Sequence, residues 1–292
     1  MSADEERSGR LFRFSQVELP WELGPPDGRY LLRAPGDPSD APPAYVLVIA
    51  TLGAAQRRGR LALNRKTQAA PEPEPALVAT GRATIIDVAE PLADVERARS
   101  WLARAGDEEL AGDLAVLNRA LHAFRLATAD PYGRAVSRRQ LLVARVGFGV
   151  GERVADGLWT EARELTLAPT QRRRGTALQP QARLAAILTG RERALVCEEL
   201  VLRARLDLDH GRDREAALQL LIALDAALAE LALDPAAPAL ADRLAELREH
   251  RDGVAVAAQA ALAGPLTPAE RESIAGTLGR IEAALRARTV LG

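Results

Sequence analysis

Residues 195–231 constrain the fold more than any other stretch, because their apolar residues predict two long helices folded back on each other. The turn lies at His210, Gly211 and Arg212, where Gly211 can adopt the left-handed conformation that ends a helix. The first segment is apolar on nearly every side, so it needs packing neighbours on several faces. The second has an apolar row at helical spacing: Ala217, Leu220, Leu221, Leu224, Leu228 and Leu231. This hairpin is therefore expected at the centre of a helical domain.

The composition limits the architecture and the partners. A chain of 292 residues is long for a single core, so two domains are expected. Only 3% of the residues are aromatic, and the core must therefore consist of Leu, Ala, Val and Ile. The net charge of -1 argues against a chain-wide electrostatic partner such as duplex DNA or an anionic membrane.

The sequence also predicts a soluble, cytoplasmic protein that does not enter a membrane. Its first residues are polar and acidic and do not resemble a signal peptide. No run of about 18 apolar residues exists that could span a bilayer. Cys197 is the only cysteine, so no intramolecular disulfide can form, and its apolar surroundings predict a buried, unreactive thiol.

Residues 10–90 are expected to form a small β domain. Phe12 and Phe14 alternate with polar residues as in a half-buried strand, and residues 45–52 are continuous, apolar and β-branched. The pattern predicts roughly four or five short strands in a mostly antiparallel sheet or barrel. Residues 1–9 are expected to be a disordered tail, and residues 53–75 a long loop that ends in alternating Pro and Glu.

From Pro91 onwards the apolar period becomes helical, so residues 91–292 are expected to form a larger helical domain. The fold class is therefore α+β. Residues 137–167 fit two interpretations. A capping box from Ser137 to Gln140 favours a helix, whereas an apolar run followed by Gly147, Gly149 and Gly151 equally suits a strand that enters a turn. We expect a helix here, and a further helix over 159–165.

Residues 200–224 resemble one tetratricopeptide repeat. In that family a small residue lies in the first helix, a glycine in the turn and an alanine one turn into the second helix, and Ala204, Gly211 and Ala216 have matching separations. Leu200 takes the place of the usual large residue early in the first helix, and no period of about 34 residues recurs on either side. The resemblance implies a surface that binds a peptide or a partner helix.

One compact polar cluster could hold a metal or perform acid–base chemistry: Asp207, Asp209, His210 and Asp213. Alternatively, these residues line the end of one helix and cap the next. His122 and His250 lack the spacing of metal ligands. The glycines at 147, 149 and 151 miss the third spacing of the dinucleotide-binding motif, and neither a P-loop nor a nucleophile elbow occurs. The sequence therefore predicts no catalytic, cofactor-binding or metal site.

These observations favour a non-enzymatic scaffold or adaptor that binds another protein through its helical domain. The first alternative is a nucleic-acid-binding protein that uses two basic loops, residues 57–66 and 172–174. Basic residues of these loops are Arg57, Arg58, Arg60, Arg65, Lys66, Arg172, Arg173 and Arg174. No aromatic residues interleave them as platforms for base stacking. The second alternative is an enzyme of unknown class with an acidic site near 207–213.

Overall fold

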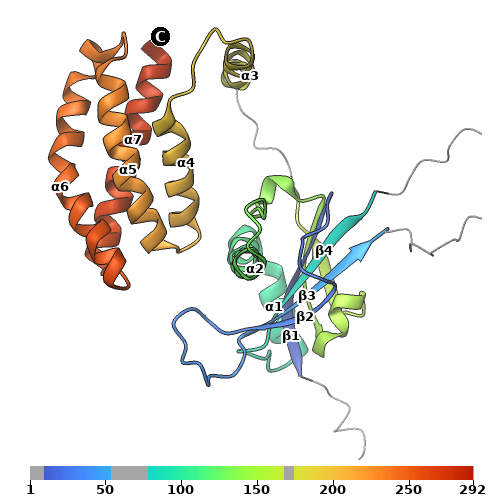
Figure 1. Cartoon of the computed structure of the whole chain (residues 1–292). Coiled ribbons are helices and arrows are strands. Elements are labelled where there is room, and N and C mark those ends of the chain that lie inside the picture. The colour runs from blue at the N-terminus through green and yellow to red at the C-terminus, as the bar shows by residue number, and fades with distance from the viewer. Residues whose placement is uncertain (1–9, 54–77, 168–173, 292) are drawn as a thin grey trace, which may run out of the picture. The chain divides into compact units, whose positions relative to one another are not determined.

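The computed structural model describes residues 10–53, 78–167 and 174–291 (Figure 1). The chain divides into two compact units, Met1–Thr170 and Gln171–Gly292, which we call the β unit and the helical unit. The predicted tail at 1–9 lies outside the described residues, as does nearly all of the predicted loop at 53–75. No helix in the described ranges is long and apolar enough to cross a bilayer.

The β unit contains a six-stranded sheet in which every neighbouring pair is antiparallel, in the order β2-β3-β4-β1-β5-β6. Its strands are β1 (Leu11–Leu19), β2 (Gly28–Leu32), β3 (Tyr45–Leu52), β4 (Thr80–Asp87), β5 (Val143–Val150) and β6 (Glu161–Glu164). The expected strand at 45–52 is β3. An antiparallel sheet followed by a helical C-terminal region confirms the predicted α+β class.

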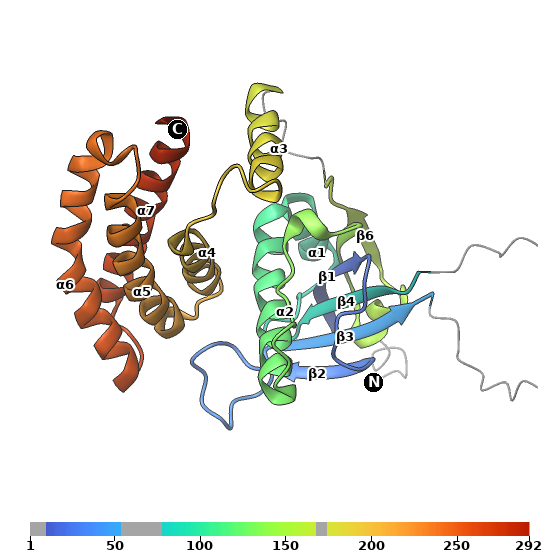
Figure 2. The ribbon, with the colours of Figure 1, turned by 45° about the horizontal axis from the view of Figure 1, so that its top comes forward.

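Helices α1 (Val95–Arg104) and α2 (Asp107–Thr128) lie along one face of the sheet (Figure 2). On α2 a row of leucines at helical spacing is buried: Leu110, Leu114, Leu117 and Leu121. These leucines share a core with Val17, Leu47 and Ile85, which project from the sheet. The period of alternating steps of four and three residues therefore marks the face of α2 that packs on the strands.

The expected helix over 137–167 is wrong. The capping box at Ser137 is present, with the Ser137 N–H donating to Gln140 Oε1 at 2.8 Å, but it begins only the short 3-10 helix η1 (Arg138–Gln140). The chain then forms β5, which pairs with β1. Residues 159–165, also expected to be helical, contain β6. The strand interpretation is therefore the correct one.

Two glycines of β5 explain why its strand pattern is weak. A Cβ at Gly147 would lie 2.6 Å from the Glu161 carbonyl oxygen and 2.8 Å from Phe14 Cζ. A Cβ at Gly149 would lie 2.7 Å from Val154 Cγ1, on the 3-10 helix η2 (Gly151–Asp156) that covers this face. Glycine therefore replaces the side chains that would otherwise alternate with Val146 and Phe148.

The domain boundary expected near Pro91 requires a correction. Helices α1 and α2 pack on the sheet, and β5 pairs with β1, so residues 91–167 belong to the same compact unit as β1–β4. The division lies between Thr170 and Gln171. A change from strand to helix periodicity marked a change of element rather than a change of domain.

The helical unit contains α3 (Arg174–Leu188), α4 (Val196–Asp209), α5 (Asp213–Ala232), the short η3 (Ala237–Leu240), α6 (Ala241–Ala263) and α7 (Pro268–Leu291). The expected hairpin is α4 and α5, and Gly211 has the left-handed φ of 68° that its turn requires. Helix α4 packs on α5 and α7, α5 on α6, and α6 on α7. Their shared core includes Val201, Leu220, Leu247 and Ile281.

The apolar row predicted on α5 lies in this core, with Leu221 and Leu228 half-buried and the other four residues buried. A carboxylate of α5 also holds the start of α4, because Glu230 accepts the N–H groups of Val196 and Cys197 at 3.0 and 2.9 Å. A negative charge at that position satisfies free N–H groups and interacts favourably with the helix dipole.

We expect residues 171–292 to fold when expressed alone, because their core is complete without the sheet. Circular dichroism should show a helical spectrum with a cooperative thermal transition. A fragment of residues 91–292 should instead aggregate, since it carries Val146 and Phe148 of β5 without β1, their pairing strand. Cooperative unfolding of β5 within the longer fragment would contradict the boundary.

Leu224→Ala should lower the free energy of unfolding by about 2–5 kcal/mol, because Leu224 has no exposed surface and its truncation leaves a cavity. Chemical denaturation of the helical unit would measure the loss. Leu233→Ala is the matched control, since this leucine is 88% exposed at the end of α5 and its truncation should change stability by less than about 0.5 kcal/mol. Equal effects would mean that the core is misassigned.

Candidate functional site

Each member of the predicted acidic cluster at 207–213 has a structural partner. Asp207 forms an ion pair with Arg212 at 2.7 Å, and Asp209 lies 3.7 Å from Arg205 one turn earlier. His210 Nδ1 lies 2.7 Å from the carbonyl oxygen of Leu206. These contacts close the turn between α4 and α5, which favours the interpretation of a helix end over that of a catalytic site.

Asp213 has a different position from the one expected. It is the first residue of α5 rather than its N-cap, and its carboxylate pairs with Arg271 of α7. The pair therefore ties the start of α5 to the start of α7. Among the residues that the structure describes, no group of three or more His, Cys, Asp or Glu side chains is placed to hold a metal ion.

The remaining candidates from the sequence are two histidines, the cysteine and the basic residues of the two loops. His122 lies on α2 and His250 on α6, both half-buried. Cys197 is buried, as expected, and burial together with its hydrogen bond to Glu230 raises the pKa of its thiol to about 12, so the thiol stays protonated near neutral pH. Arg174 begins α3, but its side chain and the other basic residues of both loops lie outside the described residues.

A polar cluster that the sequence analysis did not identify lies between the sheet and α2. Arg13 of β1 donates to the Asp87 carboxylate of β4, with Nε 2.8 Å from Oδ2. On the same face of β1, the Ser15 hydroxyl donates to the Asp113 carboxylate of α2. Tyr45 of β3 is the register partner of Asp87. Side chains from three strands and one helix therefore meet within the β unit.

The electrostatics of this cluster centre on Asp113. Burial raises the pKa of the Asp113 carboxyl to about 7, although the Ser15 hydrogen bond and the charge of Arg13 act in the opposite direction. Burial and the nearby carboxylates of Asp87 and Asp113 also raise the pKa of the Tyr45 hydroxyl. A carboxyl group of this kind can gain or lose a proton near neutral pH, so it contributes a pH-dependent stability to the β unit.

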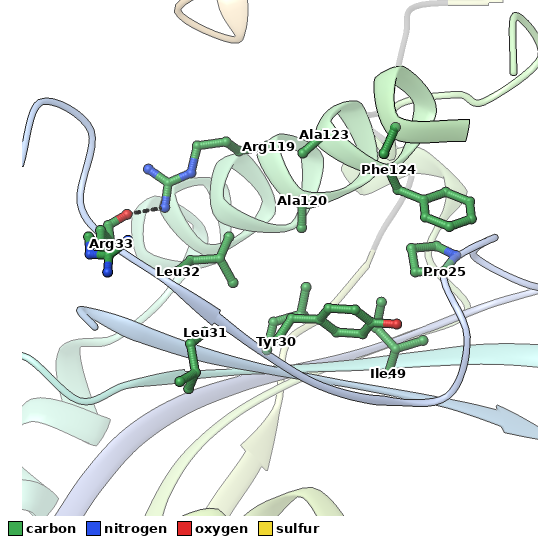
Figure 3. A pocket seen from close by; sticks show the side chains of 12 residues that line it. Pro25, Tyr30, Leu31, Leu32, Arg33, Ile49, Arg119, Ala120, Ala123 and Phe124 are labelled. Atoms are coloured by element: carbon green, nitrogen blue, oxygen red, sulfur yellow. Dashed lines mark hydrogen bonds between the residues drawn. The ribbon is translucent and has the colours of Figure 1, made fainter. Parts of the chain in front are cut away.

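The β unit has a groove between β2 and α2, which we call the β2–α2 groove (Figure 3). It has a volume of about 430 Å³, within the usual range for ligand sites. Its walls are mainly apolar and include Tyr30, Leu32, Ile49, Ala120, Ala123 and Phe124. Tyr30, Leu32 and Ile49 project from the sheet towards α2. Short alanine side chains on the facing surface of α2 leave the space between helix and strand open.

The groove is basic at one end. Arg33, just after β2, and Arg119, on α2, lie there together, whereas Pro25 and Phe124 lie at the other end (Figure 3). Arg119 donates to the Arg33 carbonyl oxygen, and Arg33 Nε donates to the Ala41 carbonyl oxygen at 2.7 Å. Neither guanidinium forms an ion pair with any side chain in the described ranges. Each has further N–H donors, because a guanidinium carries five.

The helical unit has a second apolar surface, on α4. Val196, Leu202 and Leu206 are 61%, 66% and 44% exposed. The sequence predicted neighbours on several faces of this helix, but within the helical unit its partners are α5 and α7. Leu202 and Leu206 are one turn apart and therefore share a face of the helix. Beside them, Arg203 forms an ion pair with Glu199 at 2.8 Å.

Neither surface was identified from the sequence. The groove depends on three alanines of α2, Ala120, Ala123 and Ala127, that have no signature of their own until β2 lies opposite them. The α4 residues did give a signal, since the helix is apolar on more sides than a single packing face needs. That pattern fits a helix with one exposed apolar face as well as a helix surrounded on all sides, and the sequence alone does not distinguish the two.

Asp113→Asn should change how stability depends on pH. The folded carboxyl binds its proton more tightly than the unfolded one, so its favourable contribution is complete below the ordinary pKa of 3.8 and is lost as the pH rises through about 7. The amide cannot ionise, and its oxygen can still accept from Ser15. Near pH 8 the variant should therefore be more stable than the parent by on the order of 1–3 kcal/mol.

Urea denaturation at about pH 5 and about pH 8 measures this difference. Asp40→Asn, at an exposed loop position, is the control and should leave the pH dependence unchanged. If Asp113→Asn shifts stability equally at both pH values, Asp113 does not titrate in this range and the burial argument fails.

Comparisons with known proteins add no relative: no protein-family model, no curated protein and no solved structure matches the chain. The resemblance of residues 200–224 to a tetratricopeptide repeat therefore stays a prediction. Any function must be argued from the β2–α2 groove, the α4 face and the polar clusters themselves.

Proposed function

We propose that this chain is a protein-interaction scaffold or adaptor whose helical unit binds another protein through the exposed face of α4. The observation that carries the proposal is the pair of exposed leucines on that face, Leu202 and Leu206, which project one turn apart. Scattered exposed leucines are common on protein surfaces. A pair of apolar side chains at helical spacing on the exposed face of a packed helix is the arrangement used in helix–helix recognition.

The energetics support a partner helix with an apolar face. Full burial of an exposed leucine contributes about 1.5–3 kcal/mol, so the two leucines together can supply a substantial part of a micromolar affinity. The ion pair between Glu199 and Arg203 beside the leucines adds directional polar contacts at the rim. Charged rim residues mainly determine orientation and association rate, whereas the leucines determine the affinity.

The framework behind α4 is suited to this role because it is held by charges as well as by its core. Glu198 of α4 lies 2.6 Å from Arg183 of α3 and 3.6 Å from Arg288 of α7. Arg288 also pairs with Asp234, after α5, at 2.6 Å. These contacts fix the start of α4 relative to its neighbours. A preorganised helix loses less entropy on binding than a mobile one.

Site-specific photo-crosslinking tests the proposal. A photoreactive residue placed at Leu202 or at Leu206 in living cells should trap the same protein, which mass spectrometry then identifies. Placed at Ala229, an exposed position on α5, it should not trap that protein. The identified partner, once purified, should bind the parent chain and bind Leu202→Glu at least about 30-fold more weakly, as expected for a central interface residue.

Leu262→Glu is the matched control, because Leu262 is a comparably exposed leucine on α6. It should bind the partner like the parent. Light scattering at several concentrations distinguishes a foreign partner from a second copy of the chain. Equal crosslinking at Leu202, Leu206 and Ala229, or full binding by Leu202→Glu, would overturn the proposal.

A further inference from the structure

Strand β2 has one side without a neighbour in the sheet. Among the described strands it pairs only with β3, so it forms an edge of the sheet. Backbone N–H and C=O groups along such an edge point outward and can pair with an added strand. The β2–α2 groove lies beside this edge, and the exposed Leu31 of β2 contributes to its wall (Figure 3). An unpaired strand and an apolar groove are therefore adjacent.

We propose that the β2–α2 groove binds an extended peptide segment that adds to the sheet beside β2 and carries both an apolar side chain and a carboxylate. Strand addition to an exposed sheet edge is a recurring mode of peptide recognition, in which the backbone provides affinity and pockets for alternate side chains provide specificity. This inference concerns a surface of the β unit and does not depend on the proposed role of α4.

The apolar requirement follows from the walls of the groove. Tyr30, Leu32 and Ile49 line it from the sheet, and Ala120, Ala123 and Phe124 line it from α2. In a strand added beside β2, side chains alternate between the two faces of the sheet, so every second residue points towards α2. The hydroxyl of Tyr30 donates to the Pro26 carbonyl oxygen at 2.6 Å, which leaves mainly its ring to contact a ligand.

The carboxylate requirement follows from charge. Arg33 and Arg119 lie at one end of the groove, and neither has a carboxylate partner among the side chains described. Guanidinium groups match the planar geometry of a carboxylate and can donate two parallel hydrogen bonds to it. The apolar walls nearby reduce the screening of this attraction by water. The carboxylate can belong to a peptide C-terminus or to an Asp or Glu side chain.

A peptide fits this surface better than a small amphiphile such as a fatty acid. A fatty acid could place its tail between β2 and α2 and its carboxylate at Arg119, but it has no backbone to satisfy the edge of β2. An extended peptide satisfies all three features, namely the edge groups, the apolar walls and the basic end. The peptide proposal therefore uses more of the observed chemistry.

The test begins with the full chain and a displayed library of random peptides that have free C-termini. Enriched peptides should carry apolar residues at alternating positions together with a carboxylate. A synthetic copy of an enriched peptide should bind the parent chain in fluorescence anisotropy. Ala123→Trp, which fills the groove, should abolish this binding, and Arg119→Gln should weaken it at least about tenfold.

Chemically modified versions of the peptide separate the contribution of its carboxylate from that of its backbone. A C-terminal amide should weaken binding to the parent but not to Arg119→Gln if the carboxylate is terminal, whereas Asp→Asn in the peptide should do so if it is a side chain. N-methylation of alternate backbone nitrogens should abolish binding if the peptide pairs with β2. Arg125→Gln is the matched control, since Arg125 is exposed on α2 and does not line the groove. Leu202→Glu should also bind normally, so failure of the α4 proposal is distinguishable.

Three results would overturn the inference. The first is a library that enriches no peptide above the Ala123→Trp background. The second is binding that persists in both Ala123→Trp and Arg119→Gln, which would place the peptide elsewhere. The third is binding of decanoate, lost in Arg119→Gln, without any enriched peptide, which would identify the groove as a site for small carboxylates.

Discussion

Strand β1 has hydrogen-bonded neighbours on both edges, and the β unit depends on this pairing. Ser15 lies opposite Ile85 of β4 on one side and opposite Val146 of β5 on the other. The same strand contributes Arg13 to the ion pair with Asp87 and Ser15 to the hydrogen bond with Asp113. Because β5 follows α1 and α2 in the chain, the sheet cannot be completed until residues 143–150 return to pair with β1. Pairing at such sequence separation is costly in chain entropy and is not visible in any local pattern.

Local sequence patterns predicted the elements that are stabilised by residues close to them in the chain. The α4–α5 hairpin, the turn at Gly211 and the apolar row of α5 all follow from helical spacing and turn chemistry. The strand at 45–52 follows from its continuous, apolar and β-branched sequence. The helix predicted over 137–167 is wrong for a physical reason. Gly147 and Gly149 lie where Phe14 and Val154 leave no room for a Cβ. Because β5 has no side chains at these two positions, its alternating strand pattern is weak. The capping box at Ser137 is real but stabilises a single short turn.

Prediction of the candidate sites from the sequence is limited in a similar way, because contacts between distant residues are not visible in it. The polar residues at 207–213 are close together in sequence, yet Asp213 pairs with Arg271 from a helix that begins more than fifty residues later. Conversely, the β2–α2 groove joins residues of β2 and α2 that lie far apart in the chain, and its defining alanines carry no chemical signature. A sequence identifies polar groups that cluster locally, whereas an apolar groove exists only once two distant elements are placed opposite each other. The groove could therefore not be predicted.

The two proposed binding surfaces obtain specificity in different ways. The α4 face offers side chains only, so its partner must match the spacing of Leu202 and Leu206 and the charges of Glu199 and Arg203. The β2–α2 groove adds unpaired backbone groups at the edge of β2, which any extended segment can satisfy, and relies on apolar walls and two arginines for selection. Each surface is built within one compact unit. Recognition at either proposed surface therefore requires no fixed arrangement of the two units.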